Sequence, residues 1–154
     1  MNDFVPEDFL DKKEAKRMDR NTQFSIAASK LAIEDAGIDL EKVDKRRAGV
    51  IVATGIGGVS TMHDQYETLF AKGPNRISPF FFFFFIANMA AGQTSIQFGF
   101  QAPCLCIVTA CTGGTNAIGE ATRKIQHGDA DMMLAGGTEA AISQAAVAGF
   151  CSMK

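Results

Sequence analysis

Three short apolar runs, each ending at glycines or at a sharp turn, constrain the fold of this chain more than any other feature. They span residues 47–54, 103–109 and 130–135. A continuous apolar run of this length is typical of a strand that is covered on both faces, as in a parallel sheet. Helix-compatible segments flank these runs, at residues 21–36, 60–70, 86–100 and 112–126 and again from residue 138. Strands that alternate with helices predict a layered α/β fold around a parallel sheet.

Length and composition place the chain among globular proteins. With 154 residues, of which 47% are hydrophobic and 21% charged, it has the size of one domain or of part of one. The net charge of −2 gives no electrostatic reason to expect nucleic acid or an anionic membrane as a partner. No stretch has the length and purity of a transmembrane helix, and the N-terminus lacks a secretory pattern. The sequence therefore predicts a cytoplasmic protein.

The four cysteines do not form a metal-binding or disulfide pattern. Cys104, Cys106 and Cys111 lie within eight residues, but no two cysteines have the Cys-x-x-Cys spacing, and the two histidines stand alone. We therefore expect no metal and no disulfide framework. Cys104, Cys106 and Cys151 are predicted to be small hydrophobic residues of the core.

Six consecutive phenylalanines occupy positions 80–85. A strand with an aromatic ring at every position needs apolar cover on both faces, and a helix needs it all round. The run is therefore predicted to be deeply buried, to lie at a subunit interface, or to promote aggregation.

Cys111 stands where a predicted buried strand turns directly into a predicted helix. The unpaired N–H groups at the start of a helix favour the thiolate, which is the nucleophilic form of cysteine. Gly113 and Gly114 leave room for a bulky thioester, and the N–H of Cys111 can donate to an oxyanion. These residues alone leave two interpretations open, a reactive nucleophile or an ordinary core cysteine.

Residues 109–114, with the sequence Thr-Ala-Cys-Thr-Gly-Gly, resemble the nucleophile motif of the β-ketoacyl-[acyl-carrier-protein] synthases, the condensing enzymes of fatty acid synthesis. The resemblance is greatest to the bacterial type II enzymes that elongate longer acyl chains. Other segments resemble further motifs of the family in the same order, at residues 4–9, 16–20, 55–58, 77–81, 87–92, 128–131 and 135–139.

This resemblance implies a thiolase-like layered fold and a homodimer that pairs through residues 103–109. It implies that Cys111 takes an acyl group from acyl carrier protein, and that malonyl-loaded carrier then condenses with it as carbon dioxide is lost. Ile56 and Phe81 match residues that shape the acyl pocket. No cofactor and no metal are implied.

The chain departs from the family pattern in length and in the phenylalanine run. Residues 1–154 match only part of the N-terminal half of the fold, without its opening strand, so the C-terminal half is expected to be absent. The family's two catalytic histidines belong to motifs that neither His63 nor His127 matches. We therefore expect a fragment that is acylated at Cys111 but does not condense. Residues 82–85 replace a stretch that usually contains proline. Two interpretations stay open: the four rings shorten the acyl tunnel or disturb the dimer interface, or the run is a sequencing artefact.

Two alternatives to a fatty acid condensing enzyme follow from the same motifs. A non-catalytic module that dimerises and binds a carrier protein is one, although the presence of Cys111 argues against it. A polyketide synthase ketosynthase or a thiolase is the other, and the Thr-Gly-Gly sequence of residues 112–114 fits the fatty acid enzymes better.

Overall fold

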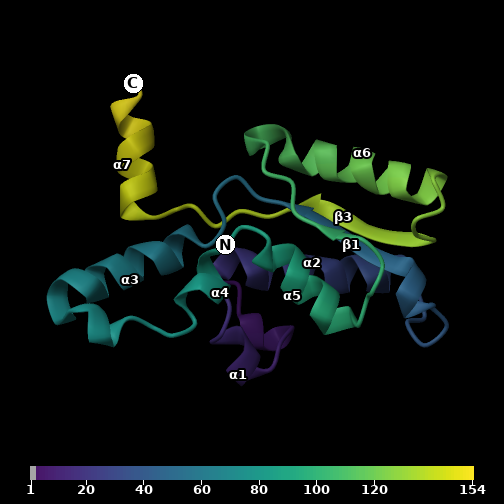
Figure 1. Ribbon diagram of the computed structural model, residues 1–154, viewed down its shortest axis with the longest axis horizontal. Coiled ribbons are helices and arrows are strands. Elements are labelled where there is room, and N and C mark those ends of the chain that lie inside the picture. The colour runs from purple at the N-terminus through teal and green to yellow at the C-terminus, as the bar shows by residue number, and fades with distance from the viewer. Residues whose placement is uncertain (1–2) are drawn as a thin grey trace.

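The computed structural model describes residues 3–154 and shows a parallel three-stranded sheet between helices (Figure 1). The strands lie in the order β2–β1–β3. β1 pairs with β3 from Ala48–Met132 to Ala53–Gly137, and with β2 at Val50–Cys104 and Ile51–Leu105. In chain order the elements are η1 (Pro6–Asp8), α1 (Lys12–Ala15), α2 (Arg20–Asp35), η2 (Lys45–Arg47), β1 (Ala48–Ala53), α3 (Val59–Lys72), η3 (Pro74–Arg76), α4 (Phe81–Phe85), α5 (Met89–Phe98), β2 (Cys104–Leu105), η4 (Ala110–Thr112), α6 (Gly113–Gln126), β3 (Met132–Gly137) and α7 (Gln144–Ser152).

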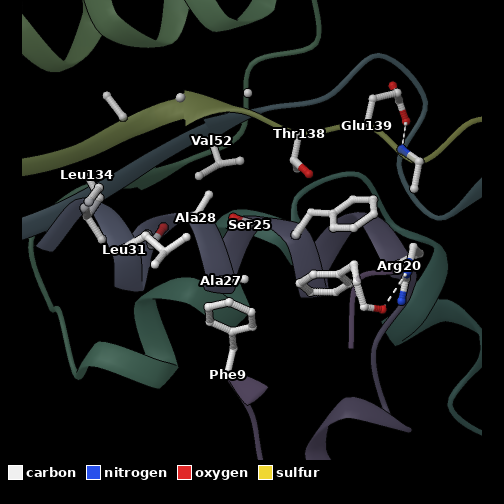
Figure 2. A pocket seen from close by; sticks show the side chains of 18 of the residues that line it. Phe9, Arg20, Ser25, Ala27, Ala28, Leu31, Val52, Leu134, Thr138 and Glu139 are labelled. Carbon is white, nitrogen blue, oxygen red and sulfur yellow. Dashed lines mark hydrogen bonds between the residues drawn. The ribbon is translucent and has the colours of Figure 1, made fainter. Parts of the chain in front are cut away.

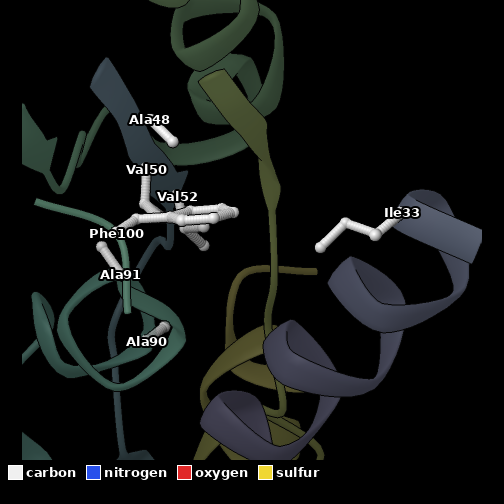
Figure 3. Packing of buried hydrophobic residues seen from close by; sticks show 7 residues of the cluster. All are labelled: Ile33, Ala48, Val50, Val52, Ala90, Ala91 and Phe100. Atoms are coloured by element: carbon white, nitrogen blue, oxygen red, sulfur yellow. The ribbon is translucent and has the colours of Figure 1, made fainter. Parts of the chain in front are cut away.

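Strand β1 is buried along its whole length because helices cover both of its faces. On one face, Val50 and Val52 pack in a cluster with Ile33 of α2 and with Ala90 and Ala91 of α5 (Figure 3). On the other face, Ile51 and Ala53 pack against Ala117 and Ala121 of α6. Alternate residues of a strand point to opposite faces, so a strand that is apolar at every position fills both cores. The predicted layered α/β fold with a parallel sheet is therefore confirmed.

Most of the predicted helices form close to their predicted bounds. Helix α2 begins at Arg20 after Asp19, whose side chain accepts a hydrogen bond from the Asn21 N–H, and it ends just before Gly37, where φ is +63°. An aspartate at the N-cap and a glycine in the left-handed region are both favoured at helix ends. Helices α3 and α6 also form as predicted, whereas α5 is shorter at both ends than the predicted segment of residues 86–100.

The predicted strand at residues 103–109 is largely wrong. Only Cys104 and Leu105 pair as a strand, and β2 lies at the edge of the sheet with β1 as its one neighbour. Leu105 is 43% exposed and Val108 is 55% exposed, so this apolar run is not covered on both faces. The run nevertheless lies alongside β1 beyond the two paired residues, since Val50 N donates to Pro103 O and Thr54 N donates to Ile107 O.

Two other predictions are corrected by the structure. Of the three alternatives predicted for the phenylalanine run, deep burial is wrong, since Phe80, Phe82 and Phe83 are 46%, 64% and 60% exposed. A subunit interface or a tendency to aggregate stays a prediction. The last helix begins at Gln144 instead of Thr138, with the Ser143 hydroxyl accepting a hydrogen bond from the Ala146 N–H. Within residues 3–154, no helix has both the length and the apolar character needed to cross a membrane.

An exposed ion pair joins η2 to the segment before β3 and should be visible in a titration. Arg47 Nη2 lies 2.7 Å from Asp131 Oδ1, and this hydrogen bond lowers the pKa of Asp131 from its ordinary value of 3.8. Because the folded-state pKa is the lower one, the pair stabilises the fold above about pH 3.8 and loses its effect as the pH falls through the folded-state pKa. We expect the Asp131 carboxyl carbon, followed by NMR, to titrate below 3.8, and Arg47→Gln to return it toward that value. Titration at 3.8 in both proteins would contradict this prediction.

Candidate active site

Cys111 lies on an exposed elbow between the segment that follows β2 and helix α6. The preceding residue, Ala110, has a φ of +49°, and residues Ala110–Thr112 form the short 3-10 helix η4 that leads into Gly113. A positive φ is uncommon for a residue with a Cβ and is often found where the backbone presents a functional side chain. The Cys111 side chain is exposed.

Thr109 closes the elbow through three hydrogen bonds. Its carbonyl oxygen accepts from the Thr112 N–H at 3.2 Å and from the Thr112 hydroxyl at 2.8 Å. Its own hydroxyl accepts from Asn116 Nδ2 at 2.8 Å. These bonds join residues before and after Cys111, so they hold the backbone of the elbow that carries it.

The first turn of α6 packs directly on the carboxyl ends of β1 and β3. A Cβ added to Gly113 would lie 2.9 Å from the Ala53 Cβ, and one added to Gly137 would lie 3.3 Å from the Gly114 Cα. Gly113 is buried, so the absence of a side chain there permits this close packing. It does not give a ligand access to the backbone, which is the role that the sequence suggests for Gly113. The elbow therefore lies at the carboxyl edge of the sheet, which is where parallel α/β sheets place their binding sites.

Residues 54–58 form a glycine-rich turn at the same edge, and this turn carries Ile56. The backbone N–H groups of Gly55 and Ile56 donate to Glu139 Oε2 at 2.8 and 3.1 Å. On the other side, Gly58 N donates to Phe85 O at 3.1 Å and so joins the turn to α4. Ile56 is 46% exposed.

Phe81, the second residue that the sequence assigns to the acyl pocket, begins α4. It is half-buried, and its ring stacks on Phe85 at 5.6 Å between centroids. Backbone hydrogen bonds connect the three predicted site segments. Phe85 O of α4 accepts from the turn at Gly58 N, and Thr54 N of the turn donates to Ile107 O, shortly before Cys111. The structure thus brings the elbow, the turn and α4 to one region.

The remaining cysteines are not core residues, and that prediction is wrong. Cys104 and Cys151 are exposed. Cys106 is half-buried, and its Sγ donates to Ala87 O at 3.3 Å. Burial raises the pKa of the Cys106 thiol, so at neutral pH this sulfur keeps its proton.

No hydrogen bond or ion pair links Cys111 to a histidine within residues 3–154. His63 lies 3.4 Å from Glu67 on the same helix. His127 caps the far end of α6, which, at about 1.5 Å per residue, places it roughly 20 Å along the helix from the elbow. In that described part of the chain there is also no cluster of three or more potential metal ligands.

An open, mainly apolar cavity of about 1010 Å³ lies between α2 and β3 (Figure 2). Leu31 and Ala28 line it from α2, Val52 and Leu134 from the sheet, and Phe9 from the N-terminal segment. Cys111, Ile56 and Phe81 do not line it, so this cavity is separate from the elbow.

Glu139 has no role that its sequence pattern alone assigns, yet its carboxylate accepts three hydrogen bonds from the glycine-rich turn, from the Thr54 hydroxyl and from the N–H groups of Gly55 and Ile56. One signal is available in the sequence, an acidic residue two positions after a strand that ends in two glycines. The carboxyl ends of parallel strands share one edge, so such a carboxylate can reach the N–H groups of a second glycine-rich turn there.

The comparisons with known proteins agree with this architecture. Residues 3–154 match the family model of the N-terminal domain of β-ketoacyl synthases. The chain belongs to the β-ketoacyl synthase family. It is 48% identical over its whole length to a 3-oxoacyl-[acyl-carrier-protein] synthase 2 of Synechocystis and 47% identical to one of Staphylococcus aureus. It spans 37% and 38% of the lengths of those two proteins.

Solved ketosynthase structures resemble the fold closely. A β-ketoacyl synthase from Burkholderia phymatum is 28% identical with a TM-score of 0.83, over 97% of this chain and 37% of that one. A ketosynthase in complex with its type II PKS acyl-carrier protein is 26% identical with a TM-score of 0.89, over 94% of this chain and 42% of that one. The predicted family and its layered ketosynthase fold are therefore confirmed.

Proposed function

We propose that Cys111 is the acyl-accepting nucleophile of a fatty acid condensing enzyme. The observation that carries this proposal is the exposed thiol on a positive-φ elbow, one turn before a helix, at the carboxyl edge of the sheet. The chain is 47–48% identical to two proteins named 3-oxoacyl-[acyl-carrier-protein] synthase 2, but 26% identical to the ketosynthase of a type II PKS. This difference in identity favours fatty acid synthesis over the polyketide alternative.

In the proposed step, the Cys111 sulfur, as the thiolate, attacks the carbonyl carbon of an acyl thioester on acyl carrier protein. A new S–C bond forms at Cys111, the S–C bond to the carrier breaks, and the carrier leaves as a thiolate that takes up a proton. The positive end of the α6 dipole favours the anionic sulfur that this step requires.

The developing negative charge on the carbonyl oxygen needs a nearby donor. Within residues 3–154 the backbone N–H of Cys111 has no hydrogen-bond partner. A free N–H beside the nucleophile supports its role as one donor of an oxyanion hole.

We further propose that Ile56 and Phe81 shape the pocket for the acyl chain. Both are apolar, and both lie on segments joined by backbone hydrogen bonds to each other or to the segment before Cys111. The rings of Phe82 and Phe83 are exposed, and that of Phe82 lies 5.2 Å from the ring of Phe81 between centroids. These two rings are expected to limit the chain length or to lie at an interface.

The proposed partners are acyl carrier protein, in its acyl- and malonyl-loaded forms, and a second copy of the chain. A related ketosynthase is described in complex with an acyl-carrier protein, which supports the first. Residues 103–109, with the exposed edge strand β2 and the exposed side chain of Val108, support pairing of two copies there. The proposed setting is the cytoplasm. Decarboxylation and condensation require further donors, so residues 1–154 alone are expected to be acylated without releasing carbon dioxide.

Mass spectrometry of labelled peptides tests this proposal. On exposure to an acyl-carrier thioester, Cys111 is expected to be acylated while the exposed Cys104 and Cys151 stay free. With iodoacetamide at neutral pH, Cys111 is expected to react at least about tenfold faster than Cys106, whose pKa is raised by burial.

Cys111→Ala is the control and should abolish acylation. Equal acylation of Cys104 or Cys151 would show that no thiol is special and would refute the proposal. Release of one carbon dioxide per malonyl-carrier by the purified chain would refute the expectation that it does not condense.

A further inference from the structure

Glu139 holds the glycine-rich turn of residues 54–58 through a single carboxylate oxygen. Its Oε2 accepts from the N–H of Gly55 at 2.8 Å, from the N–H of Ile56 at 3.1 Å and from the Thr54 hydroxyl at 3.3 Å. Hydrogen bonds to an ionised carboxylate are stronger than those to a neutral acceptor. One side chain thus satisfies two consecutive backbone donors of the turn.

The backbone around Glu139 is itself fixed, as a positioning residue requires. Thr138 N donates to Ala53 O at 2.9 Å, and the Thr138 hydroxyl donates to Asn21 O at 2.7 Å. On the other side, the Ser60 hydroxyl donates to Ala140 O at 3.4 Å. Figure 2 shows Thr138 and Glu139 in succession after β3, with the Thr138 side chain directed toward α2. The segment that carries Glu139 is therefore anchored to the sheet, to α2 and to α3.

On the side of the turn opposite Glu139, the backbone of α4 packs closely against Gly57 and Gly58. A Cβ at Gly57 would lie 2.9 Å from Phe85 O, and one at Gly58 would lie 2.2 Å from Phe84 O. The turn is held between α4 and Glu139. Since its other members after Thr54 are glycines, Ile56 is the one side chain whose direction this arrangement determines.

We propose that Glu139 is a positioning residue that sets the acyl chain-length preference by fixing Ile56. This inference rests on the proposed function, because it takes Ile56 to line the acyl pocket. Without the carboxylate, the donors of Gly55 and Ile56 turn to water and the turn becomes mobile. The discrimination between short and long acyl chains is then expected to weaken toward that of Ile56→Ala.

Amide hydrogen exchange tests the positioning directly, without any need for activity. In Glu139→Ala, the amides of Gly55 and Ile56 are expected to exchange at least about tenfold faster, while the amides of β1 keep their protection. Glu139→Gln keeps an acceptor oxygen and should restore most of the protection, whereas Glu139→Asp is one methylene too short and should resemble alanine. Glu120→Ala, which removes an exposed carboxylate paired with Arg123 on α6, is the matched control and should change neither amide.

Acylation of Cys111 by short-chain and long-chain acyl-carrier thioesters tests the consequence. A wild-type chain that is not acylated refutes the proposed function, while the exchange data still decide whether Glu139 fixes the turn. Acylation with an unchanged chain-length ratio in Glu139→Ala, together with a changed ratio in Ile56→Ala, overturns the inference. If Glu139→Ala unfolds, Glu139→Asp takes its place, and wild-type exchange at Gly55 and Ile56 in that variant also overturns it.

Discussion

Replacing Gly58 by alanine is expected to destabilise the protein by about 3 kcal/mol, because the added methyl group has no space. The new Cβ would lie 2.2 Å from Phe84 O and 2.9 Å from the Phe85 Cα. Both are backbone atoms of α4, so a rotation of a side chain cannot relieve the contact. Helix α4 must move away from the turn, and the hydrogen bond from Gly58 N to Phe85 O is then lost.

Chemical denaturation measures this effect, with Gly119→Ala as the matched control. Gly119 lies in α6, and a Cβ added there meets no atom within 4 Å. Alanine is favoured over glycine inside a helix by about 1 kcal/mol, so the control is expected to be more stable than the wild type. A Gly58→Ala protein as stable as the wild type would show that the turn and α4 are not in close contact in solution.

The Gly58 substitution also reaches the candidate site. The turn that α4 supports carries Ile56, and α4 itself carries Phe81. A displaced α4 is therefore expected to change the acylation of Cys111 with acyl chains of different length. The effect on stability should be the larger of the two, because the clash exists with or without a ligand.

The sequence predicts the elements whose pattern is local and fails where burial depends on distant partners. Strand β1 and helices α2 and α6 form as predicted because the hydrophobic pattern of each lies within its own segment. The apolar run at residues 103–109 was expected to be covered on both faces, but it lies at an edge with one neighbour. An apolar run is compatible both with a core strand and with an edge strand at an interaction surface, because both contain hydrophobic residues.

The same limit applies to the candidate site. Cys111 was found from a local strand–turn–helix pattern. The role of Glu139 could not be predicted, because its partners Gly55 and Ile56 lie 84 and 83 residues earlier in the chain. The late start of α7 has the same origin, since Thr138 and Glu139 bond to α2 and to the turn instead of beginning a helix. Such contacts depend on the order of strands in the sheet, which local propensity does not encode.

Asp19 provides the second large effect, since its buried carboxylate joins the starts of two helices. The residue is 3% exposed. Its Oδ1 accepts from the Asn21 N–H at the start of α2, at 3.1 Å. Its Oδ2 accepts from the N–H of Thr61 in the first turn of α3, at 3.0 Å, and from the Thr61 hydroxyl at 2.6 Å. The first contact is a local helix cap, whereas the second joins residues 42 positions apart in the chain.

Asp19→Ala is expected to lower the free energy of unfolding by about 3 kcal/mol, because it leaves three donors without their charged acceptor. For a domain of this length that corresponds to a fall in the melting temperature of about 10 °C. Asp19→Asn should have a stability between those of Asp19→Ala and the wild type, since its amide oxygen can replace only one of the accepting oxygens, while its NH₂ group meets a donor at the other.

Asp11→Ala separates this effect from ordinary capping. Asp11 caps α1 in the same way, through Lys13 N at 2.7 Å, but it is exposed, and within residues 3–154 its side chain bonds to no second element. Its loss is expected to cost only about 1 kcal/mol. If thermal unfolding followed by circular dichroism gives Asp19→Ala and Asp11→Ala equal losses, the link to α3 contributes nothing. A threefold difference means that one carboxylate fixes α3, and with it the end of the Ile56 turn, to the start of α2.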